Sequence, residues 1–387
     1  MQSNNRKQSD QSTRWRAMRI LIAAIFLLPV FALRAGPASA AEVSAGIVYV
    51  MSNAAEANAV LVFERAADGS LSEAGAFPTG GLGTGAGLGS QGAVVLHENG
   101  RWLFAVNAGS NEVSVFSVTP DGLQLKDTEP SGGELPISLT ARENLLYVLN
   151  AGGSGNITGF TIALNGELSP LPGSTRSLSN GGAGAAPGPA QISFSPNGVL
   201  LVVTEKASNQ ILTYVVGSDG LPSDPVAHPS AGETPFGFDF SRRNYLIVSE
   251  AFGGAADASV VSSYQLIGGD LKVISPAVAT TETAACWVVV TQNGKFAYVT
   301  NTGSGTISGY RVRPDGSLVL LDADGVTGVT GPGSSPIDAA FSAGDSFLYV
   351  LNAGAHTIAG FQLVAGGGLI PLGEVSVPAG SVGIAAQ

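Results

Sequence analysis

Short runs of alternating apolar and polar residues recur along the chain, and many of them end in Asn followed by a small residue and Gly. Clear copies are Leu103–Asn107, Leu146–Asn150, Phe296–Asn301 and Phe347–Asn352. Alternation with a period of two is typical of half-buried β-strands. After the first 40 residues, no stretch has the 3.6-residue period of a helix. The pattern predicts an all-β protein built from one repeated unit.

The polar residue that ends each of these strands, which we call the anchor, allows the units to be counted. The anchors are Asn53, Asn107, Asn150, Glu205, Glu250, Asn301 and Asn352. Five of them are followed, 14 or 15 residues later, by Asp-Gly or Asn-Gly, as at Asp68-Gly69. This dipeptide suits a β-hairpin with a type I′ turn. Each unit therefore holds four antiparallel strands, A to D, as the blade of a β-propeller does.

Seven anchors predict seven blades, and the ends of the chain predict how the ring closes. The first anchor has one strand before it, at 47–52, and too little chain for a complete A–B hairpin. The segment 381–386 instead resembles the strand A segment 335–340. We expect the C-terminal strand to complete the first blade, which leaves no exposed sheet edge.

The connections between strands sort onto two rims, because successive strands run in opposite directions. The A–B and C–D turns are short and share one rim. The B–C turns and the long, Gly-rich D–A links share the other. Loops at one end of a rigid scaffold usually carry function. We therefore expect a small-molecule or protein ligand to bind at this loop-rich rim, close to the anchors and the mouth of the central channel.

The candidate binding residues lie at the ends of strand B, at the starts of strand A or in the connections of the loop-rich rim. They are Asn107, Asn150, Glu250, Asn301, Asn352, Gln191, Trp287, Asp338, His228 and His356. Turn formation is the alternative explanation for the Asn anchors, since Asn side chains often bond to nearby backbone. The two histidines are candidate acids or bases, or simply loop residues.

Glu205 and Glu250 replace Asn in neighbouring blades. Two carboxylates at a channel mouth could share a proton or hold a divalent cation; the alternative is a pair of solvated rim acids. Beyond that, no metal-binding motif such as H-E-x-x-H occurs, and no cofactor is expected. Residues 87–92 match G-x-G-x-x-G, but they precede a strand, and one chance match is expected in a chain with 53 Gly residues.

The first 40 residues have the pattern of an export signal. A basic segment is followed by the apolar run 20–33 and by Ala38-Ser39-Ala40, which predicts cleavage before Ala41. The alternative is an uncleaved membrane anchor, for which the run is short. We expect residues 41–387 to form a single exported domain, periplasmic or extracellular, without a membrane span and monomeric.

Charge narrows the choice of partner. Charged residues are 12% of the chain and its net charge is −11. Residues 1–40 hold six basic residues and one acid, so residues 41–387 carry −16. Such a surface repels phosphate backbones, and nucleic acid is not an expected partner. Cys286 is the one cysteine, so no internal disulfide can form. Its apolar neighbours predict a buried thiol.

The repeat sequence resembles the lactonase-like seven-bladed propellers, the group of 6-phosphogluconolactonase and carboxymuconate cyclase. The resemblance covers residues 41–387 and is carried by Pro189–Gly198, Thr234–Phe240 and Phe347–Gly354. It implies a lactone ring-opening hydrolase. In the family's enzymes an Arg-His pair opens an inner strand and a Glu closes the next one, with a further Arg nearby. In this chain the corresponding residues are Ala190-Gln191 and Glu205-Lys206, so the acid is present and the pair is missing.

Three functions remain open from the sequence. In a secreted lactonase-like hydrolase, Glu205 would act as the general base on water, and Lys206 or Arg176 would stabilise the oxyanion. A non-catalytic extracytoplasmic propeller would bind a small ligand, a cation or a protein at the same rim. A structural or surface protein is the third possibility. The missing Arg-His pair favours the last two, and the shared architecture favours the first.

Overall fold

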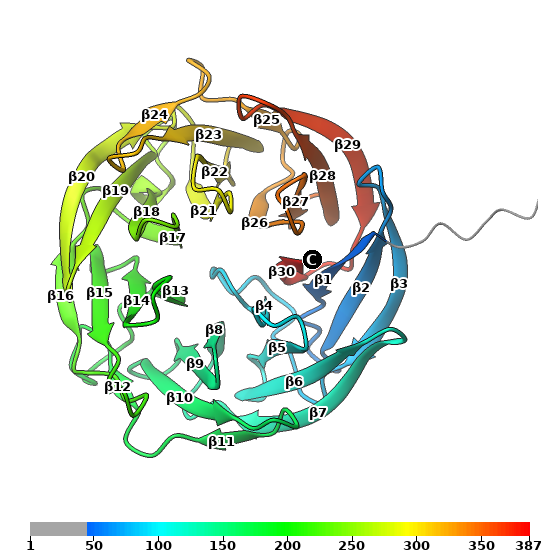
Figure 1. Ribbon diagram of the computed structural model, residues 1–387, viewed down its shortest axis with the longest axis vertical. Helices are drawn as coiled ribbons and strands as arrows, with labels where there is room; N and C mark the ends of the chain where they lie inside the picture. Colours follow the sequence, from blue (N-terminus) through cyan, green and yellow to red (C-terminus); the bar gives the residue numbers. More distant parts are fainter. Residues whose placement is uncertain (1–44) are drawn as a thin grey trace, which may run out of the picture. The chain divides into compact units, whose positions relative to one another are not determined.

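The computed structural model describes residues 45–387, which form a closed ring of seven four-stranded antiparallel blades (Figure 1). The predicted seven-bladed β-propeller is therefore confirmed. The predicted export signal at residues 1–40 lies outside the described residues. Within the described part of the chain, no helix is long and apolar enough to cross a membrane.

The first four blades contain the following strands, in the order A to D. Blade 1 contains β30 (Val382–Ala386), β1 (Gly46–Met51), β2 (Ala59–Arg65) and β3 (Leu71–Pro78). Blade 2 contains β4 (Val94–Leu96), β5 (Trp102–Asn107), β6 (Glu112–Thr119) and β7 (Gly122–Pro130). Blade 3 contains β8 (Pro136–Arg142), β9 (Leu145–Asn150), β10 (Asn156–Ile162), β11 (Leu168–Pro170) and β12 (Arg176–Ser177). Blade 4 contains β13 (Pro189–Phe194), β14 (Leu200–Glu205), β15 (Gln210–Val215) and β16 (Val226–Pro229).

The last three blades follow the same order. Blade 5 contains β17 (Pro235–Phe240), β18 (Tyr245–Glu250), β19 (Val260–Ile267) and β20 (Asp270–Ala279), with the short 3-10 helix η1 (Phe252–Gly254) after β18. Blade 6 contains β21 (Ala285–Val290), β22 (Phe296–Asn301), β23 (Thr306–Val312), β24 (Leu318–Leu320) and β25 (Gly328–Val329). Blade 7 contains β26 (Pro336–Phe341), β27 (Phe347–Asn352), β28 (Thr357–Leu363) and β29 (Leu369–Ser376). In blades 3 and 6 the outer strand is split into two short pieces, each paired with strand C.

The C-terminal strand closes the ring, as the sequence predicts. β30 pairs antiparallel with β1, with Tyr49 opposite Ala385 and Val50 opposite Ile384. The label for the C-terminus in Figure 1 lies beside β30, at the inner edge of the first blade. Strand closure therefore joins the two ends of the described chain within one sheet.

Apolar side chains of neighbouring blades pack against each other to form the core. The second strands are buried throughout, as in β5 and β22, whereas outer strands such as β3 are largely exposed. Tyr hydroxyls in three second strands also donate to a Gly carbonyl in the C–D turn of the next blade: Tyr147 to Gly220 (2.6 Å), Tyr298 to Gly367 (2.7 Å) and Tyr349 to Gly69 (2.8 Å). Adjacent blades are thus joined by apolar packing and by a repeated hydrogen bond.

The Asp-Gly hairpins differ in one detail from the predicted type I′ turn. Gly69 has φ 89°, but Asp68 is not among the residues with positive φ. The Gly69 amide donates to the Ala66 carbonyl, and the Ala66 amide donates to the Ser70 carbonyl. These bonds define a three-residue loop in which Gly alone takes the left-handed conformation. The Asp68 side chain instead accepts from the Ser70 amide, which stabilises the turn.

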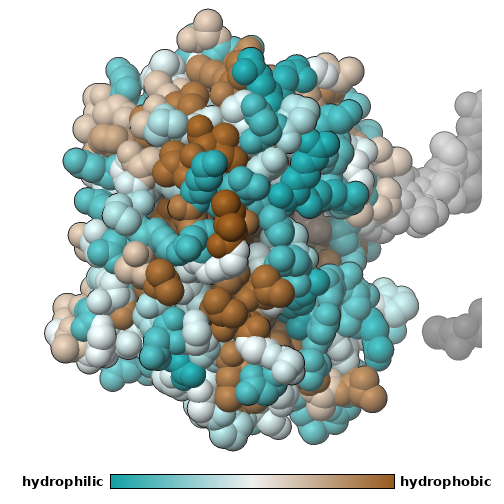
Figure 2. Space-filling view, turned by 60° about the vertical axis from the view of Figure 1, so that its left-hand side comes forward, coloured by the Kyte–Doolittle hydropathy of each residue, from teal (hydrophilic) through white to brown (hydrophobic). Residues whose placement is uncertain are grey.

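The outer wall of the ring is mixed in character. Figure 2 shows the side that carries β16 and β20, where hydrophobic atoms gather in separate patches among hydrophilic ones. Exposed apolar residues of these blades are Val215, Val226, Ile267 and Val273.

Candidate functional site

The seven anchors are buried side chains and do not form a solvent-facing ring at the mouth. Six of them are the last residue of a second strand, and Asn53 follows β1 by two residues. All seven have 0% exposure. The strand ends lie on the loop-rich rim as predicted, but the side chains are enclosed by strand C and by the links. Their burial corrects the expectation of an open amide ring.

The hydrogen bonds of Asn107 show what an anchor does. Its amide donates to Ser114 on strand C of the same blade, at 2.7 Å. Its oxygen accepts from Asn58 (2.9 Å) and from Thr79 (2.7 Å), which belong to the preceding blade and its outgoing link. Asn150 likewise donates to the Ser131 carbonyl in the link that enters its own blade. These anchors tie strand B to strand C and to the incoming D–A link, which supports the structural explanation for them.

The remaining Asn anchors bond either to strand C or to the outgoing link. Asn301 donates to Thr306 and Ser308, and Asn352 donates to Thr357. Asn53 donates to Thr84 and to the Ala86 carbonyl in the long link that leaves its blade. Asn107, Asn150, Asn301 and Asn352, which were predicted to bind a ligand, are therefore closed off from solvent. The side-chain oxygens of Asn150, Asn301 and Asn352 have no hydrogen-bond partner among residues 45–387.

Glu205 and Glu250 occupy the same buried position in blades 4 and 5. Glu205 accepts from the Ser179 amide (3.0 Å) and from the hydroxyls of Ser179 and Ser208, both at 2.5 Å. Both acids are fully buried, so the picture of two solvated rim acids is wrong. Each carboxylate is bonded within its own blade and the link entering it.

Glu250 has a separate set of donors. It accepts from Ser230 (2.9 Å), Ser262 (2.9 Å) and Tyr264 (3.2 Å). Burial raises the pKa of Glu250 to about 7, against the lowering effect of these hydrogen bonds. Across residues 45–387, no group of three or more His, Cys, Asp or Glu side chains is arranged to hold a metal ion.

Arg176 and the two candidate histidines lie apart from these acids. Arg176 is on β12 at the outside of blade 3, where it pairs with Asp224 at 3.5 Å and donates to the carbonyls of Gly173 and Thr175. His228 is on the outer strand β16, with its Nε2 at 3.0 Å from the Thr213 hydroxyl. Its place on the outer strand corrects the expectation of a mouth-side histidine. His356 is exposed in the B–C turn of blade 7, on the loop-rich rim.

The central channel is crossed by the link between blades 1 and 2. In Figure 1 the loop that enters β4 reaches the centre of the ring. Gln91 of this link donates its side-chain amide to the Val288 carbonyl (2.9 Å) and accepts from the Val288 amide, on β21 of blade 6. Its own backbone amide donates to the Ala190 carbonyl of blade 4. The Gly-rich motif at 87–92 is therefore part of a channel plug.

The inner strands are also tied to one another around the channel. The Gln191 side chain donates to the Phe238 carbonyl and accepts from the Phe238 amide, which joins blades 4 and 5. The Asp338 carboxylate accepts from the amides of Ala339 and Ile384, which joins blades 7 and 1. Both side chains border a channel cavity of about 290 Å³. These candidate binding residues therefore contact the cavity while they hold its wall together.

Two inner-strand carboxyls are poorly hydrated. Burial raises the pKa of Asp338 to about 8. Loss of hydration also raises the pKa of Asp239 to about 6, although that carboxylate accepts from the amides of Phe240 and Val290. The channel wall thus contains two carboxyl groups that titrate near neutral pH.

Lys206 is the candidate that reaches the mouth. It follows β14 on the loop-rich rim, and its Nζ donates to the Gly89 carbonyl of the channel plug at 2.7 Å. The same Nζ lies 4.6 Å from the centroid of the Phe236 ring, which packs edge-on against Trp287 at 4.6 Å between ring centroids. Burial lowers the pKa of Lys206 to about 8. An amine of that pKa is partly neutral at physiological pH.

Trp287 and Cys286 complete this mouth cluster. Trp287 is buried, and its Nε1 has no hydrogen-bond partner among residues 45–387. The Cys286 thiol donates to the Ala284 carbonyl, and burial raises the pKa of Cys286 to about 11. The predicted buried thiol is confirmed. A thiol of this pKa is protonated at neutral pH and is a poor nucleophile.

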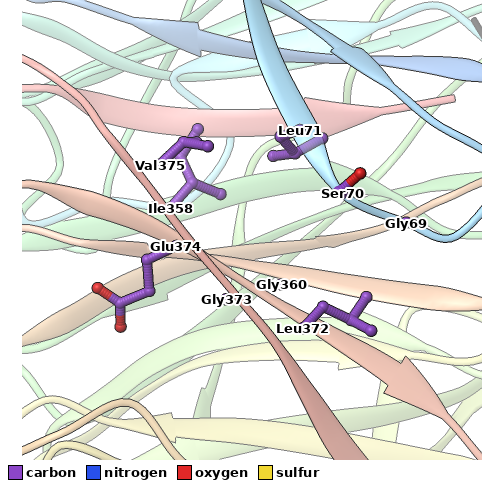
Figure 3. Close-up of a pocket in the computed structure, with 9 residues that line it drawn as sticks. All are labelled: Gly69, Ser70, Leu71, Ile358, Gly360, Leu372, Gly373, Glu374 and Val375. Carbon is purple, nitrogen blue, oxygen red and sulfur yellow. The ribbon is translucent and has the colours of Figure 1, made fainter. Parts of the chain in front are cut away.

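A separate pocket lies between the last and first blades. It has a volume of about 130 Å³ and is lined by Gly69–Leu71 and by residues of β28 and β29. Figure 3 shows the Glu374 carboxylate, its one ionisable group, pointing away from Leu71 and Val375. The pocket therefore offers no pair of reactive groups.

Comparison with known proteins agrees with this architecture. Residues 43–178 match the family model described as Lactonase, 7-bladed beta-propeller. Over this part the chain resembles that family, and its fold is a seven-bladed β-propeller. No curated protein matches it in sequence.

Solved structures similar to this propeller include three with lactonase names. A candidate 6-phosphogluconolactonase of Bacteroides fragilis has 16% identity and a TM-score of 0.69, covering 90% of this chain and 99% of its own. One from Bacteroides uniformis has 17% identity and a TM-score of 0.70, covering 88% and 99%. The periplasmic gluconolactonase of Pseudomonas aeruginosa has 17% identity and a TM-score of 0.67, covering 86% and 97%. At these identities the likeness shows the shared fold.

Some residues of the mouth were not among the candidate site residues, and two of them, Gly89 and Gln91, lie in the 87–92 motif that was set aside as a chance match. Gln91 and Gly89 come from the link after blade 1, and Phe236 comes from blade 5, far from Lys206 in sequence. The high Gly content of the 79–92 link indicated a loop, but nothing in its sequence indicated a crossing of the channel. Phe236 follows the Pro that begins β17, a position where other blades carry small or aliphatic residues.

Proposed function

We propose that this lactonase-like propeller opens a lactone ring at the channel mouth, beside Lys206. The observation that carries the proposal is the position of Lys206: its amine is partly desolvated, has a pKa of about 8, and lies between the channel plug and the Phe236–Trp287 pair. A base with a pKa near the working pH is well suited to proton transfer.

In this reaction the neutral Lys206 amine takes a proton from a water molecule as the water oxygen attacks the lactone carbonyl. The carbonyl carbon then expels the ring oxygen, and the resulting ammonium returns the proton to that oxygen. The products are one hydroxyl and one carboxylic acid, so the atoms of lactone and water balance. The Trp287 indole brings an unpaired N–H to the same cluster, which suits a developing oxyanion.

Glu205, which the sequence analysis predicted as the general base, does not act as the base in this proposal. Both of its oxygens are bonded, and it is fully buried. One partner, Ser208, is in the turn that also carries Lys206. We assign Glu205 as a positioning residue that holds this turn. Arg176, which is paired with Asp224 on the outer side of blade 3, has no part in the site.

We propose, from their sequence pattern, that residues 1–40 direct export of the protein. The protein would then bind its substrate outside the cytoplasm. Three similar structures carry lactonase names, and one of those proteins is described as periplasmic. We expect the substrate to be a small lactone that binds beside Lys206 and the Gly89 carbonyl, in a propeller that we propose is monomeric.

Ligand binding without turnover is the second candidate function. The observation that favours it is that the Glu205 carboxylate is already occupied by hydrogen bonds from Ser179. Among the hydrogen bonds and ion pairs of residues 45–387, no carboxylate contacts the Lys206 amine. In that case the same mouth would bind a small ligand and leave it unchanged.

The test is hydrolysis of glucono-δ-lactone by the purified protein, corrected for spontaneous opening. We expect kcat/KM to rise with pH through about 8, and Lys206→Met to lower kcat/KM by about 100-fold. Glu205→Gln loosens the turn that carries the base, so it should lower kcat, but by less than Lys206→Met does. Lys272→Met, on the exposed face of β20, is the matched control and should keep the wild-type rate. Absence of turnover, or a Lys206→Met variant at full rate, would reject hydrolysis at this site; saturable binding without product would support the second function.

A further inference from the structure

Five cationic side chains converge on one groove in the rim opposite the mouth. The groove lies between blades 5 and 6 and has a volume of about 440 Å³. Its cations are Arg242, Arg243, Lys295, Arg311 and Arg313, and Tyr245 lines one wall. Arg242, Arg243 and Lys295 come from A–B turns, and Arg311 and Arg313 come from the end of β23 and the turn after it.

The groove concentrates positive charge on an acidic protein. The chain has 18 Lys and Arg residues and a net charge of −11, and five of the 18 line this groove. All five are exposed. Within residues 45–387 the one salt bridge joins Arg176 and Asp224, so none of the five cations is neutralised by a direct ion pair.

Two carboxylates interact electrostatically with these cations: Asp315 with Arg313, and Asp345 with Arg242. Asp315 accepts from the amide and the hydroxyl of Ser317 in its own turn. Asp345 is buried and accepts from the Gln292 amide at 2.7 Å. Five cations and these two carboxylates leave the groove with an excess of positive charge, which favours an anion.

Part of the groove is held in place by contacts with backbone and with an aromatic ring. Arg243 donates to the Pro314 carbonyl at 2.9 Å, and the Tyr245 hydroxyl donates to the same carbonyl at 3.2 Å. Arg311 lies over the Phe296 ring, 5.1 Å from its centroid. Arg242, Lys295 and Arg313 make no hydrogen bond through their charged groups in the described structure, so their donors are free for a ligand.

We propose that this groove binds a compact anion with two or more charges, of the class of organic phosphates and polycarboxylates. Guanidinium groups match phosphate and carboxylate oxygens with paired donors. The groove has the volume of a small-molecule site, and Tyr245 and Pro314 add an apolar wall. A long polyanion is disfavoured, because it would extend from the groove over a surface of negative charge.

The experiment is calorimetric titration of the full chain with inorganic pyrophosphate and with citrate at about 0.15 M ionic strength, where long-range attraction is screened. We expect saturable binding of at least one of them. The double variant Arg242→Gln/Arg313→Gln should raise Kd by about 10-fold or more, because two charge-assisted hydrogen bonds are lost. Both substitutions are on exposed turn positions, so folding should be preserved.

Arg101→Gln is the matched control, because Arg101 is an exposed residue in the A–B turn of blade 2 on the same rim. Its Kd should stay within about twofold of wild type. Equal weakening by the control and the double variant would show diffuse attraction and overturn the proposal. Absence of binding to either anion would also overturn it. So would binding confined to vesicles of anionic lipid, which would assign the groove to a membrane surface.

Discussion

At the scale of single residues, one position of the repeat is filled by Asn in five blades and by Glu in two. In four blades, at Asn107, Asn150, Glu205 and Glu250, this side chain bonds both to strand C or the B–C turn and to the incoming link. Asn301 and Asn352 bond to strand C alone, and Asn53 bonds to the outgoing link. The Asn and Glu side chains thus have related structural roles. They differ in charge. An amide is neutral when buried, but a buried carboxylate loses its hydration, and this loss raises its pKa. Glu250 therefore links the stability of blade 5 to pH.

Glu250→Gln should flatten part of the pH dependence of stability. The pKa of Glu250 is 4.5 unfolded and about 7 folded, so the folded protein binds more protons between these values. Its contribution is complete below about pH 4.5 and is lost as pH rises through about 7, a difference of about 3 kcal/mol. Urea unfolding at pH 5 and pH 8 measures the difference in free energy of unfolding between the two pH values.

Glu374→Gln is the control, because its carboxyl is exposed, and it should keep the wild-type difference between pH 5 and pH 8. If Glu250→Gln also keeps the wild-type difference, Glu250 is not the group that titrates.

The sequence located these residues but not what surrounds them. Alternation identified the strand ends, and strand direction placed them on the correct rim. The anchor side chains are buried because residues from distant links cover them: Ser179 is 26 residues before Glu205, and Thr79 is 28 residues before Asn107. Periodicity carries no information about such contacts. The acids could therefore be predicted to lie near the mouth, while their enclosure could not.

At the scale of elements, the D–A link at 79–92 does more than connect two blades. It crosses the channel, and its contacts reach blades 3, 4 and 6 through Ser90 and Gln91. It also accepts the Lys206 hydrogen bond through Gly89. The position of the candidate catalytic amine thus depends on an element whose sequence indicated only a Gly-rich loop with a chance motif.

Gln91→Ala should destabilise the propeller by about 1–3 kcal/mol for each Val288 group left without a partner. Val288 is on the innermost strand of blade 6, and the Gln91 side chain satisfies both its amide and its carbonyl. The midpoint of urea unfolding measures the loss. Gln292→Ala, at an exposed turn position, is the control and should leave the midpoint unchanged. An unchanged midpoint for Gln91→Ala would show that the plug does not support the ring.

At the scale of the whole propeller, the sequence predicted the architecture well because the repeat is local. Each blade forms from consecutive strands with short turns, so spacing and hairpin dipeptides were enough to count seven blades. Closure was predictable because the sequence of 381–386 matches a strand A. The basic groove was not predictable, since its five cations come from two blades and converge through packing of their turns. Lys295 and Arg242 are 53 residues apart.

Removal of residues 381–387 should open the ring. This deletion takes away β30, together with the buried Val382 and Ile384, and leaves β1 with an unpaired edge. Loss of two buried aliphatic side chains and of the hydrogen bonds between β30 and β1 should lower the free energy of unfolding by about 4 kcal/mol or more. This is a large part of a typical free energy of unfolding of about 5–15 kcal/mol. Size-exclusion chromatography and thermal unfolding should show association through the free edge and a lower, broader transition. Tyr349→Phe is the control: it removes one bond across the same blade junction, from the Tyr349 hydroxyl to Gly69, and should stay monomeric with a small shift. A truncated chain that is monomeric and unfolds at the wild-type temperature would show that the ring is stable without its closing strand.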